Sequence, residues 1–561
     1  MDKQFFFERN LLALSGQNPG LCARLSAAET TLNRYKFLES RSGETIPALI
    51  DAARGAHPLH SLIDPRREGE RLISTLKDEG FLVFPGLGGG YAVEAALQRP
   101  GLYRALVIDY DINGVAELLC SREYIKILGD PRCRLMVDPS GEELEAYILE
   151  HYQPALSGGI RVFPLRARTK FAGPRFNAAG ESIQNALTKV SADYSVQAYF
   201  GARWFSNIIR NLEQAAVQNG PFPPIREAAI CAAGPSLDAQ IPLLAEQRRS
   251  AKRAPFIIAT DTSLPSLFNA GLEPDAVVSI DCQHISYYHF MAGLPPHIPL
   301  FLDLASPPLL AGFSSRPRFF SGGHPLAAYV SRRWRFIPPV DVSGANVTYA
   351  CLSLAETLGA EGITLYGADF SCPRGQVYSR GAYIYPYFDT RQNRFSPKEA
   401  LFSAFLYRNF PLNKIRGGGP DDWYYETAIL NRYRSLLEAK AAAMETPVRA
   451  IPGRGAPIRI GQGGQKNSRR FPRIFASGPE QKSLRAFLEE YRNGIKRLPP
   501  LEKDIFAGIA RLTEEERAIF ITLLPLAAAV KRRENTPGPP ETIEAARDYC
   551  VKKIDRFTAR L

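Results

Sequence analysis

The sequence predicts an α/β protein with a Rossmann-like doubly wound central domain, a second Rossmann-like N-terminal domain and a helical C-terminal domain. Short apolar segments alternate with helical patterns from residue 228 to residue 366, which is typical of a parallel sheet covered by helices. An apolar segment near the start runs into a glycine-rich turn, and helical periodicity dominates after residue 481. A chain of 561 residues is too long for one core. We therefore expect three domains, comprising residues 1–180, 181–455 and 456–561.

The N-terminal domain is predicted from the segment 80–111. An apolar strand at 81–84 leads into a turn that contains Gly86, Gly88, Gly89 and Gly90. A helical pattern and a second strand at 105–108 follow, and this strand ends at Asp109 and Asp111. A glycine turn with an acid about 20 residues later is typical of half a nucleotide-binding fold. The segment therefore predicts the fold. Because the spacing of the glycines is not GxGxxG, it leaves open whether the turn binds a ligand.

The central domain begins with a helical pattern over 181–217 that we expect to bridge domains. The segment 219–225, rich in proline, interrupts this helix. Seven strands of a mostly parallel sheet are then predicted, at 228–233, 255–260, 276–280, 298–302, 318–320, 339–342 and 362–366.

Small, hydroxyl and carboxylate residues follow these strands. In an open parallel sheet, ligands bind at the carboxyl ends of the strands. Several such residues at one edge therefore indicate a binding crevice. The candidates are Gly234, Pro235, Ser236, Asp261, Asp281, Ser343, Gly344, Gly367 and Asp369.

Each of these positions has two explanations. Ser236 and the pair Ser343–Gly344 precede helices, whose N-termini can hold a phosphate; either serine could equally cap its helix. Asp261 and Asp281 could bind Mg²⁺ on a nucleotide, or accept hydrogen bonds within their loops. The segment 376–394, rich in tyrosine, phenylalanine and arginine, could stack on a base or sugar, or cover the sheet edge.

Other chemistries are less well supported. The seven histidines lack metal-binding spacing, although His284 and His324 each follow a predicted strand. No GxSxG motif of a serine hydrolase occurs. The net charge of +12 suits anionic substrates, but the basic clusters at 248–253, 466–473 and 531–533 are typical of solvated faces. No motif for nucleic-acid binding accompanies them.

We expect a cytoplasmic location and no membrane span. The longest apolar run, 518–530, is shorter than the roughly 20 residues that a bilayer requires. The apolar start of the chain is interrupted at 8–10, unlike a secretory signal. The eight cysteines show no CxxC spacing, which is consistent with reduced thiols.

The segments "AAGPSLD", "IIATDTSLPSLFNAGLEPDAVVSID" and "VSGANVTYACLSLAETLGAEGITLYGADFS" resemble the motility accessory factor (Maf) family of flagellin glycosyltransferases. The likeness extends to "FFERNLLALS", "ARWFSNIIRNL", "TAILNRYRSLLE" and "GRGAPIRIG". The central domain of this family shares its classification with 6-hydroxymethylpterin pyrophosphokinase-like proteins and is similar to bacterial sialyltransferases.

The resemblance implies transfer of a nonulosonic acid, of the pseudaminic or legionaminic type, from a CMP-sugar to serine or threonine of flagellin. It implies that the donor nucleotide contacts the positions matching the motifs, without a tightly bound cofactor. These positions are Gly234, Pro235, Ser236, Ser343, Gly344, Gly367, Asp369 and Phe370. Asp261 and Asp281 would complete the donor site, with Mg²⁺ possible there.

The sequence departs from the sialyltransferases at the catalytic base. Those enzymes use a histidine after the G-x-D-F strand, but no histidine follows His324 here. Asp369, Asp389, Tyr378 or a histidine from another loop are the open candidates. Two other functions also stay open: pyrophosphoryl transfer from Mg·ATP to a hydroxymethyl pterin, and a flagellar assembly factor with a vestigial nucleotide pocket.

Overall fold

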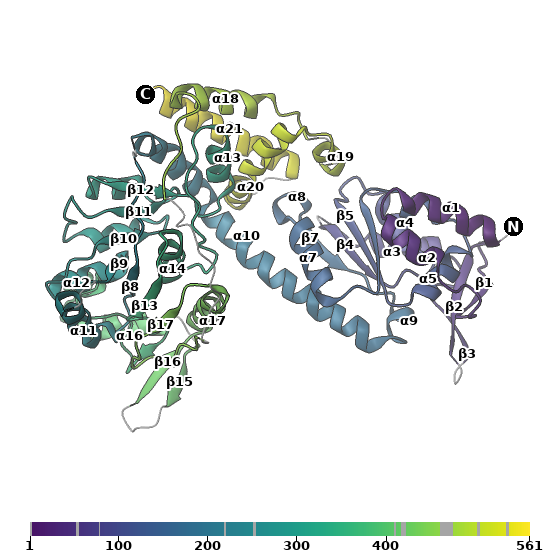
Figure 1. Ribbon diagram of the computed structural model, residues 1–561. Helices are drawn as coiled ribbons and strands as arrows, with labels where there is room; N and C mark the ends of the chain where they lie inside the picture. Colours follow the sequence, from purple (N-terminus) through teal and green to yellow (C-terminus); the bar gives the residue numbers. More distant parts are fainter. Residues whose placement is uncertain are drawn as a thin grey trace. The chain divides into compact units, whose positions relative to one another are not determined.

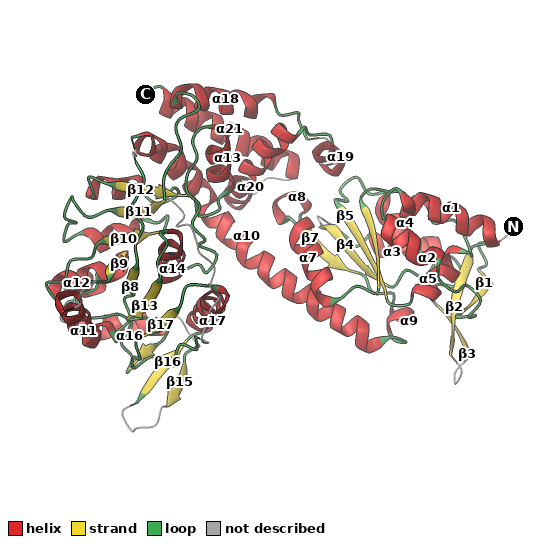
Figure 2. Ribbon diagram, viewed as in Figure 1, coloured by secondary structure: helices red, strands yellow, loops and turns green. Residues whose placement is uncertain are grey.

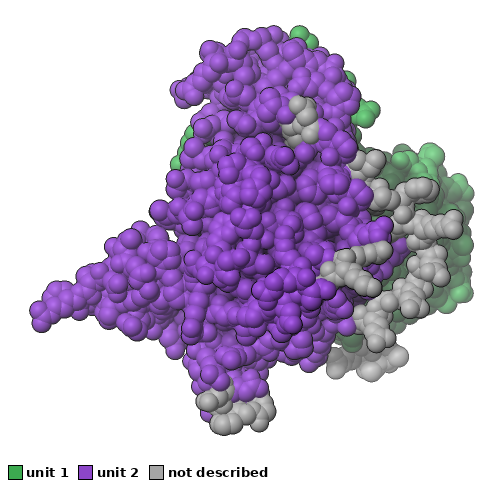
Figure 3. Space-filling model, turned by 60° about the vertical axis from the view of Figure 1, so that its left-hand side comes forward, with its two compact units in different colours: residues 1–202, 494–549 green, residues 203–493, 550–561 purple. Residues whose placement is uncertain are grey.

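The computed structural model describes residues 3–51, 55–77, 79–217, 220–250, 254–408, 411–416, 422–460, 475–501, 505–534 and 538–561. Two compact units can be distinguished, coloured separately in Figure 3. Unit 1 comprises residues 1–202 and 494–549, and unit 2 comprises residues 203–493 and 550–561. The three predicted domain boundaries stay a prediction.

Unit 1 contains a four-stranded parallel sheet in the order β6-β5-β4-β7. Its strands are β4 (Glu79–Pro85), β5 (Arg104–Asp109), β6 (Cys133–Val137) and β7 (Gly159–Val162). The apolar residues 81–84 and 105–108 are buried, because helices pack on both faces of a parallel sheet. The predicted second Rossmann-like fold is thus confirmed.

Several further elements complete the first part of unit 1. An antiparallel sheet consists of β1 (Tyr35–Glu39), β2 (Thr45–Asp51) and β3 (Gly55–Pro58). The helices are α1 (Lys3–Ser15), α2 (Pro19–Ser26), α3 (Pro65–Ile73), α4 (Tyr91–Leu97), α5 (Ile112–Leu119), α6 (Ile125–Leu128), α7 (Gly141–His151), α8 (Pro154–Ser157) and α9 (Arg166–Thr169).

Unit 2 is built on a seven-stranded parallel sheet in the order β12-β11-β10-β9-β8-β13-β17. Its strands are β8 (Glu227–Cys231), β9 (Phe256–Thr260), β10 (Ala276–Ser279), β11 (Leu300–Asp303), β12 (Pro317–Phe320), β13 (Gly362–Tyr366) and β17 (Val448–Ala450). Successive strands extend from β8 in one direction up to β12, and β13 then pairs with the other side of β8. This reversal is the topology of a doubly wound sheet and confirms the predicted fold class.

Helices cover both faces of this sheet (Figures 1 and 2). Helices α11 (Leu237–Ser250) and α12 (Leu264–Asn269) lie on one side, opposite α14 (Val347–Thr357) and α17 (Ala428–Ala443). The core under α14 includes Ile230, Ile258 and Phe301, with Ala350 and Leu354 from the helix itself. The remaining helices are α13 (Pro325–Arg333), α15 (Ile384–Asp389) and α16 (Lys398–Tyr407).

A small antiparallel sheet adjoins the end of β13 in the sequence. It has the order β14-β16-β15, with β14 (Cys372–Pro373), β15 (Asn413–Arg416) and β16 (Trp423–Glu426). Three 3₁₀ helices also occur in unit 2, namely η1 (Asp261–Ser263), η2 (His284–Phe290) and η3 (Pro308–Phe313).

The boundary between the units falls within α10 (Gly173–Ala216). The chain after residue 484 is helical as predicted, with α18 (Leu484–Arg497), α19 (Ile505–Ala510), α20 (Glu514–Glu534) and α21 (Pro539–Thr558). Within unit 1, Gly201 of α10 lies so close to α20 that an added Cβ would stand 1.9 Å from the carbonyl oxygen of Pro525. Among the described helices, none combines the length and apolarity needed to cross a membrane.

Two details of the predicted elements were wrong. No strand forms at 339–342; only a single bridge joins Ser321 and Pro339, because the two prolines at 338 and 339 restrict ladder pairing. The helix predicted from residue 181 begins earlier, at Gly173. The short strand β17 was not predicted, because Arg449 separates its two apolar residues and no continuous apolar run results.

Candidate functional site

A cavity of about 280 Å³ lies in unit 2 at the carboxyl ends of the central strands. Its walls come from the segments after β8 (232–234), β9 (260 and 262) and β13 (367–372), and from the start of α14 (346–348). Residues of α16, α17 and the loops near them complete the lining. Since β13 and β8 flank the point where the strand order reverses, the cavity lies where doubly wound sheets bind ligands.

The cavity contains some of the predicted site residues and not others. Gly234, Gly367, Asp369, Phe370 and Tyr378 line it. The remaining predicted residues do not contribute to its lining: Pro235, Ser236, Asp261, Asp281, Ser343 and Gly344. Their assignment to a donor site stays a prediction.

Ser236 is held by Asp369 rather than acting as a helix cap. Its hydroxyl donates to Asp369 Oδ1 at 2.6 Å, and its amide donates to Asp369 Oδ2 at 2.8 Å. The same hydroxyl accepts from the amide of Arg454 at 2.7 Å, and the Gly455 amide donates to Asp369 Oδ1 at 3.1 Å. Three distant segments thus meet at one buried carboxylate, in an arrangement we call the Asp369 latch.

The latch determines the chemistry available to Asp369. Burial raises the pKa of its carboxyl above the usual value, although the hydrogen bonds from Ser236 and Gly455 act in the opposite direction. Both carboxylate oxygens accept hydrogen bonds from the chain. Asp369 therefore shapes the cavity wall in this structure and presents no unoccupied oxygen among these contacts.

The backbone next to the latch requires glycine at two positions. Gly367 has a φ of +62°, and an added Cβ would stand 2.4 Å from the carbonyl oxygen of Ala232. At Gly234, a Cβ would stand 2.4 Å from Asp369 Oδ2. Phe370 has a φ of +42°, which is an uncommon conformation for an aromatic residue and is frequent at functional sites.

The helix after Ser343–Gly344 begins later than predicted. Asn346 caps α14 by accepting from the Tyr349 amide at 3.0 Å. Ser343 instead lies 3.2 Å from the Tyr349 hydroxyl, and its amide donates to Asp341 at 3.0 Å. Burial alone would raise the pKa of Asp341, but hydrogen bonds from Ser343, Tyr349 and Lys440 outweigh it and lower the pKa to about 2.

Asp281 accepts a hydrogen bond within its own loop, and Asp261 accepts from its own loop and from the end of β10. Asp261 accepts from the amide and hydroxyl of Thr262 and, at 2.6 Å, from the hydroxyl of Ser279. Asp281 accepts from the amide of Gln283 at 2.9 Å, and burial raises the pKa of its carboxyl. Across the described residues, no cluster of three or more histidine, cysteine or acidic side chains could hold a metal ion. Mg²⁺ binding here stays a prediction.

The segment 376–394 forms an aromatic wall. Tyr378 packs with Tyr383, Phe388 and Phe405 in one hydrophobic cluster that includes α15 and α16. Burial raises the pKa of Tyr378 far above that of free tyrosine. The thiol of Cys372, also in the lining, has its pKa raised to about 11 by burial. Both groups are therefore protonated at neutral pH.

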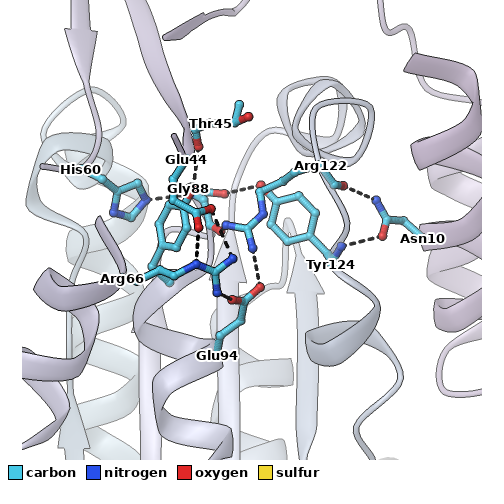
Figure 4. Close-up of polar contacts among 11 residues, drawn as sticks. Asn10, Glu44, Thr45, His60, Arg66, Gly88, Glu94, Arg122 and Tyr124 are labelled. Atoms are coloured by element: carbon cyan, nitrogen blue, oxygen red, sulfur yellow. Dashed lines mark hydrogen bonds and ion pairs between the residues drawn. The ribbon is translucent and has the colours of Figure 1, made fainter. Parts of the chain in front are cut away.

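The N-terminal glycine turn is filled by side chains of unit 1 (Figure 4). The Gly89 amide donates to His60 Nε2 at 2.8 Å, and Tyr124 and Arg122 donate to the carbonyls of Gly88 and Gly89 at 2.8 Å. The predicted acid also serves the turn, because Asp109 accepts from the Leu87 amide at 3.1 Å and from Arg168 at 2.6 Å. These contacts favour the ligand-free alternative.

Arg122 belongs to a wider ion-pair network. It pairs with Glu94, which in turn pairs with Arg66 at 3.2 Å, and Arg66 also pairs with Glu44. The network holds helix α4 against the antiparallel sheet, since Glu44 directly precedes β2. Its charges are mutually satisfied within unit 1.

Comparisons with known proteins agree with this architecture. The family model described as "6-hydroxymethylpterin diphosphokinase MptE-like" matches residues 203–375. One uncharacterized protein of Treponema pallidum (strain Nichols) is 36% identical over 151 residues, covering 26% of this chain and 70% of the relative. A second one from the same organism is 31% identical over 150 residues, covering 26% of this chain and 52% of that relative.

A solved structure matches the whole chain. The Maf glycosyltransferase from Magnetospirillum magneticum AMB-1 superposes with a TM-score of 0.59 at 13% identity, covering 100% of this chain and 96% of that one. The chain belongs to the Maf family of MptE-like proteins. The resemblance predicted from the sequence is thus confirmed, and the structural match shows the shared fold.

Several residues that line the cavity of this Maf protein were not predicted from the sequence: Asn346, Thr348, Arg408, Thr427, Ile429 and Tyr433. Asn346 could have been found, because an asparagine directly before a helical pattern is a common cap. Thr348 lies in the first turn of α14, Thr427 caps α17, Ile429 and Tyr433 lie on α17, and Arg408 directly follows α16. Local sequence pattern does not indicate that any of these residues lines a cavity.

Proposed function

We propose that this Maf protein is an inverting glycosyltransferase. It would move a nonulosonic acid from its CMP-activated form to a serine or threonine of flagellin. The observation that carries this proposal is the cavity at the β8/β13 switch point, in a chain with the fold of a Maf glycosyltransferase. The eight free cysteines support the proposed cytoplasmic location.

In the proposed reaction, the oxygen of an acceptor hydroxyl bonds to the anomeric carbon of the donor. The bond from that carbon to the phosphate oxygen breaks, CMP leaves, and the hydroxyl proton passes to a base. Asp369 is the candidate base in the lining, because its raised pKa increases its affinity for a proton. Its Oδ2 accepts from the Ser236 amide, and a carboxylate oxygen has a second lone pair that could take the proton. Tyr378, which is protonated at neutral pH, would instead donate a hydrogen bond.

Backbone groups would stabilise the departing phosphate. The first amides of α14 have no partners within the helix, and residues 346–348 line the cavity. Such fixed dipoles stabilise negative charge that develops in a transition state. This supports the implied role of the segment after Ser343–Gly344, shifted by three residues toward Asn346.

Calorimetry with CMP and ATP, each with and without Mg²⁺, tests the proposal. We expect CMP to bind without metal. Ile429→Trp should abolish CMP binding, because Ile429 lines the cavity and its exposure of 56% lets a larger side chain be accommodated. Leu243→Trp is the matched control, since Leu243 on α11 is 51% exposed and does not line the cavity.

One alternative function has a specific observation in its favour. The matched family model carries the name of a pterin diphosphokinase, so pyrophosphoryl transfer from Mg·ATP is the second candidate. A preference for Mg·ATP over CMP in the same titrations would support it. Absence of binding to either nucleotide would favour the assembly-factor alternative.

A further inference from the structure

The cavity is poor in charge for a site that would hold an anionic donor. Among the described residues that line it, the charged side chains are Asp369 and Arg408. Asp369 is negative when ionised, and its oxygens belong to the latch. A phosphate or carboxylate inside the cavity therefore finds side-chain positive charge at Arg408.

The position of Arg408 is fixed without an acidic partner. It follows α16 directly as the C-terminal cap residue, where the helix dipole favours a cation. Its guanidinium carbon lies 3.6 Å from the centre of the Phe405 ring, and stacking of this kind stabilises an arginine by its face. In the described part of the chain, no acidic side chain forms an ion pair with it. The N–H groups at the edge of the guanidinium thus remain available to a ligand.

Comparison with a second arginine that stacks on an aromatic ring shows what is specific to Arg408. Arg391 is also exposed and stacks on an aromatic ring, at 4.0 Å from the centre of Tyr387. It does not line the cavity. The positive charge of Arg408 also acts on Tyr378 and Tyr383, whose pKa values are raised by burial and lowered in part by this arginine. Its charge therefore acts on Tyr378 in the cavity lining.

We propose that Arg408 is the anion-binding residue of the cavity, and that its guanidinium forms paired hydrogen bonds with the phosphate or the sugar carboxylate of the donor. Arginine suits this role because its planar donors match both anions in a bidentate geometry. The proposal rests on the proposed function, and it deepens that function by assigning the recognition of the donor's negative charge to a residue outside the family motifs.

The test measures binding of CMP, cytidine, CMP-N-acetylneuraminic acid and ATP by calorimetry to the full chain. In Arg408→Gln, we expect CMP or CMP-N-acetylneuraminic acid to bind roughly 10- to 100-fold more weakly, the usual range for a hydrogen bond to a charged group. Cytidine affinity should change less than about twofold. Arg408→Lys should recover part of the loss, and Arg391→Gln should bind every ligand as the wild type does.

Comparison of the four ligands shows which anionic group Arg408 binds. Weakened CMP binding assigns Arg408 to the phosphate, and a loss confined to CMP-N-acetylneuraminic acid assigns it to the carboxylate. Equal affinities of wild type and Arg408→Gln for every anion overturn the proposal. If the wild type binds ATP but no cytidine ligand, the proposed donor is wrong, and the effect of Arg408→Gln on ATP decides about Arg408 alone. A wild type that binds no anion overturns both.

Discussion

Removal of the Ser236 hydroxyl tests whether the Asp369 latch is mainly structural. In Ser236→Ala, the Asp369 carboxylate loses the 2.6 Å hydrogen bond from that hydroxyl, and the Arg454 amide loses its acceptor. A hydrogen bond to a charged group contributes about 1.5–3 kcal/mol. Because Arg454 can regain contact with water, we expect a total loss of about 2 kcal/mol in the free energy of unfolding of unit 2.

Tryptophan fluorescence is the appropriate assay. All three tryptophans, Trp204, Trp334 and Trp423, belong to unit 2, so thermal unfolding followed by fluorescence reports this unit. At roughly 2 °C for each kcal/mol in a unit of this size, the midpoint should fall by about 4 °C. Ser250→Ala is the matched control, because the exposed Ser250 hydroxyl donates to the Glu246 carbonyl within α11, and it should change the midpoint by less than about 1 °C.

A double-mutant cycle makes this prediction refutable. Asp369→Asn should also destabilise unit 2, and the double variant should show a coupling of at least about 1 kcal/mol, since the Ser236 hydroxyl donates a hydrogen bond to the Asp369 carboxylate. Energies that add within about 0.5 kcal/mol would refute the latch. An unchanged midpoint in Ser236→Ala, together with lost CMP binding, would instead support direct contact between Ser236 and the nucleotide.

Four further substitutions, one of them a control, test other parts of the chain. Asp341, whose pKa is lowered to about 2, stabilises the folded state above pH 4, and this contribution is lost as the pH falls toward 2. In urea titrations, Asp341→Asn should therefore cost about 1 kcal/mol at pH 6, a value reduced for its partial exposure, and less at pH 3. Gly201→Ala should destabilise unit 1 by about 2–4 kcal/mol, because the added methyl group clashes with Pro525. Gly180→Ala in the same helix is the control, since open space surrounds Gly180, and it should stabilise unit 1 by about 0.5–1 kcal/mol. Calorimetric unfolding of both variants measures the two effects. His60→Ala should lower the calorimetric midpoint of unit 1 by depriving the Gly89 amide of its acceptor, at a cost of about 1–2 kcal/mol, and a gain of nucleotide binding at this turn would contradict its structural role.

The strands β4 and β5 of unit 1 and β8 to β13 of unit 2 could be predicted, because buried strands are continuous apolar runs between turns. The strands β6, β7 and β17 were not predicted. A crevice at the carboxyl ends of the strands was expected from the doubly wound fold. Gly234, Gly367 and Asp369 line the cavity found there, and their role in donor binding stays a prediction. The partners of these residues could not be predicted, since the contacts of Ser236 with Asp369 and Arg454 join positions far apart in the sequence. Local pattern offered only phosphate binding or helix capping for Ser236 for the same reason.

The cavity-lining residues at α16 and α17 could not be predicted from local sequence pattern, for a different reason. Residues such as Arg408 and Tyr433 carry ordinary helical sequence around them, and their role depends on how the helices return to the sheet. The resemblance to Maf proteins supplied the family, but it did not supply these side chains, because the motifs that carry it lie on the strands and on the first turns after them.

The Asp369 latch has a consequence for the order in which parts of the chain fold during synthesis on the ribosome. Its donors come from residues 236, 454 and 455, so a nascent chain that has emerged only as far as α17 holds a carboxylate whose partners are incomplete. The strand β17, which pairs with β13 just before residue 454, arrives in the same late segment. Because contacts between distant positions form slowly, the strands β8 to β13 can assemble before β17 and the latch do. The Asp369 carboxylate in the cavity wall would thus acquire its full set of hydrogen-bond donors only after the segment 448–456 has been synthesised.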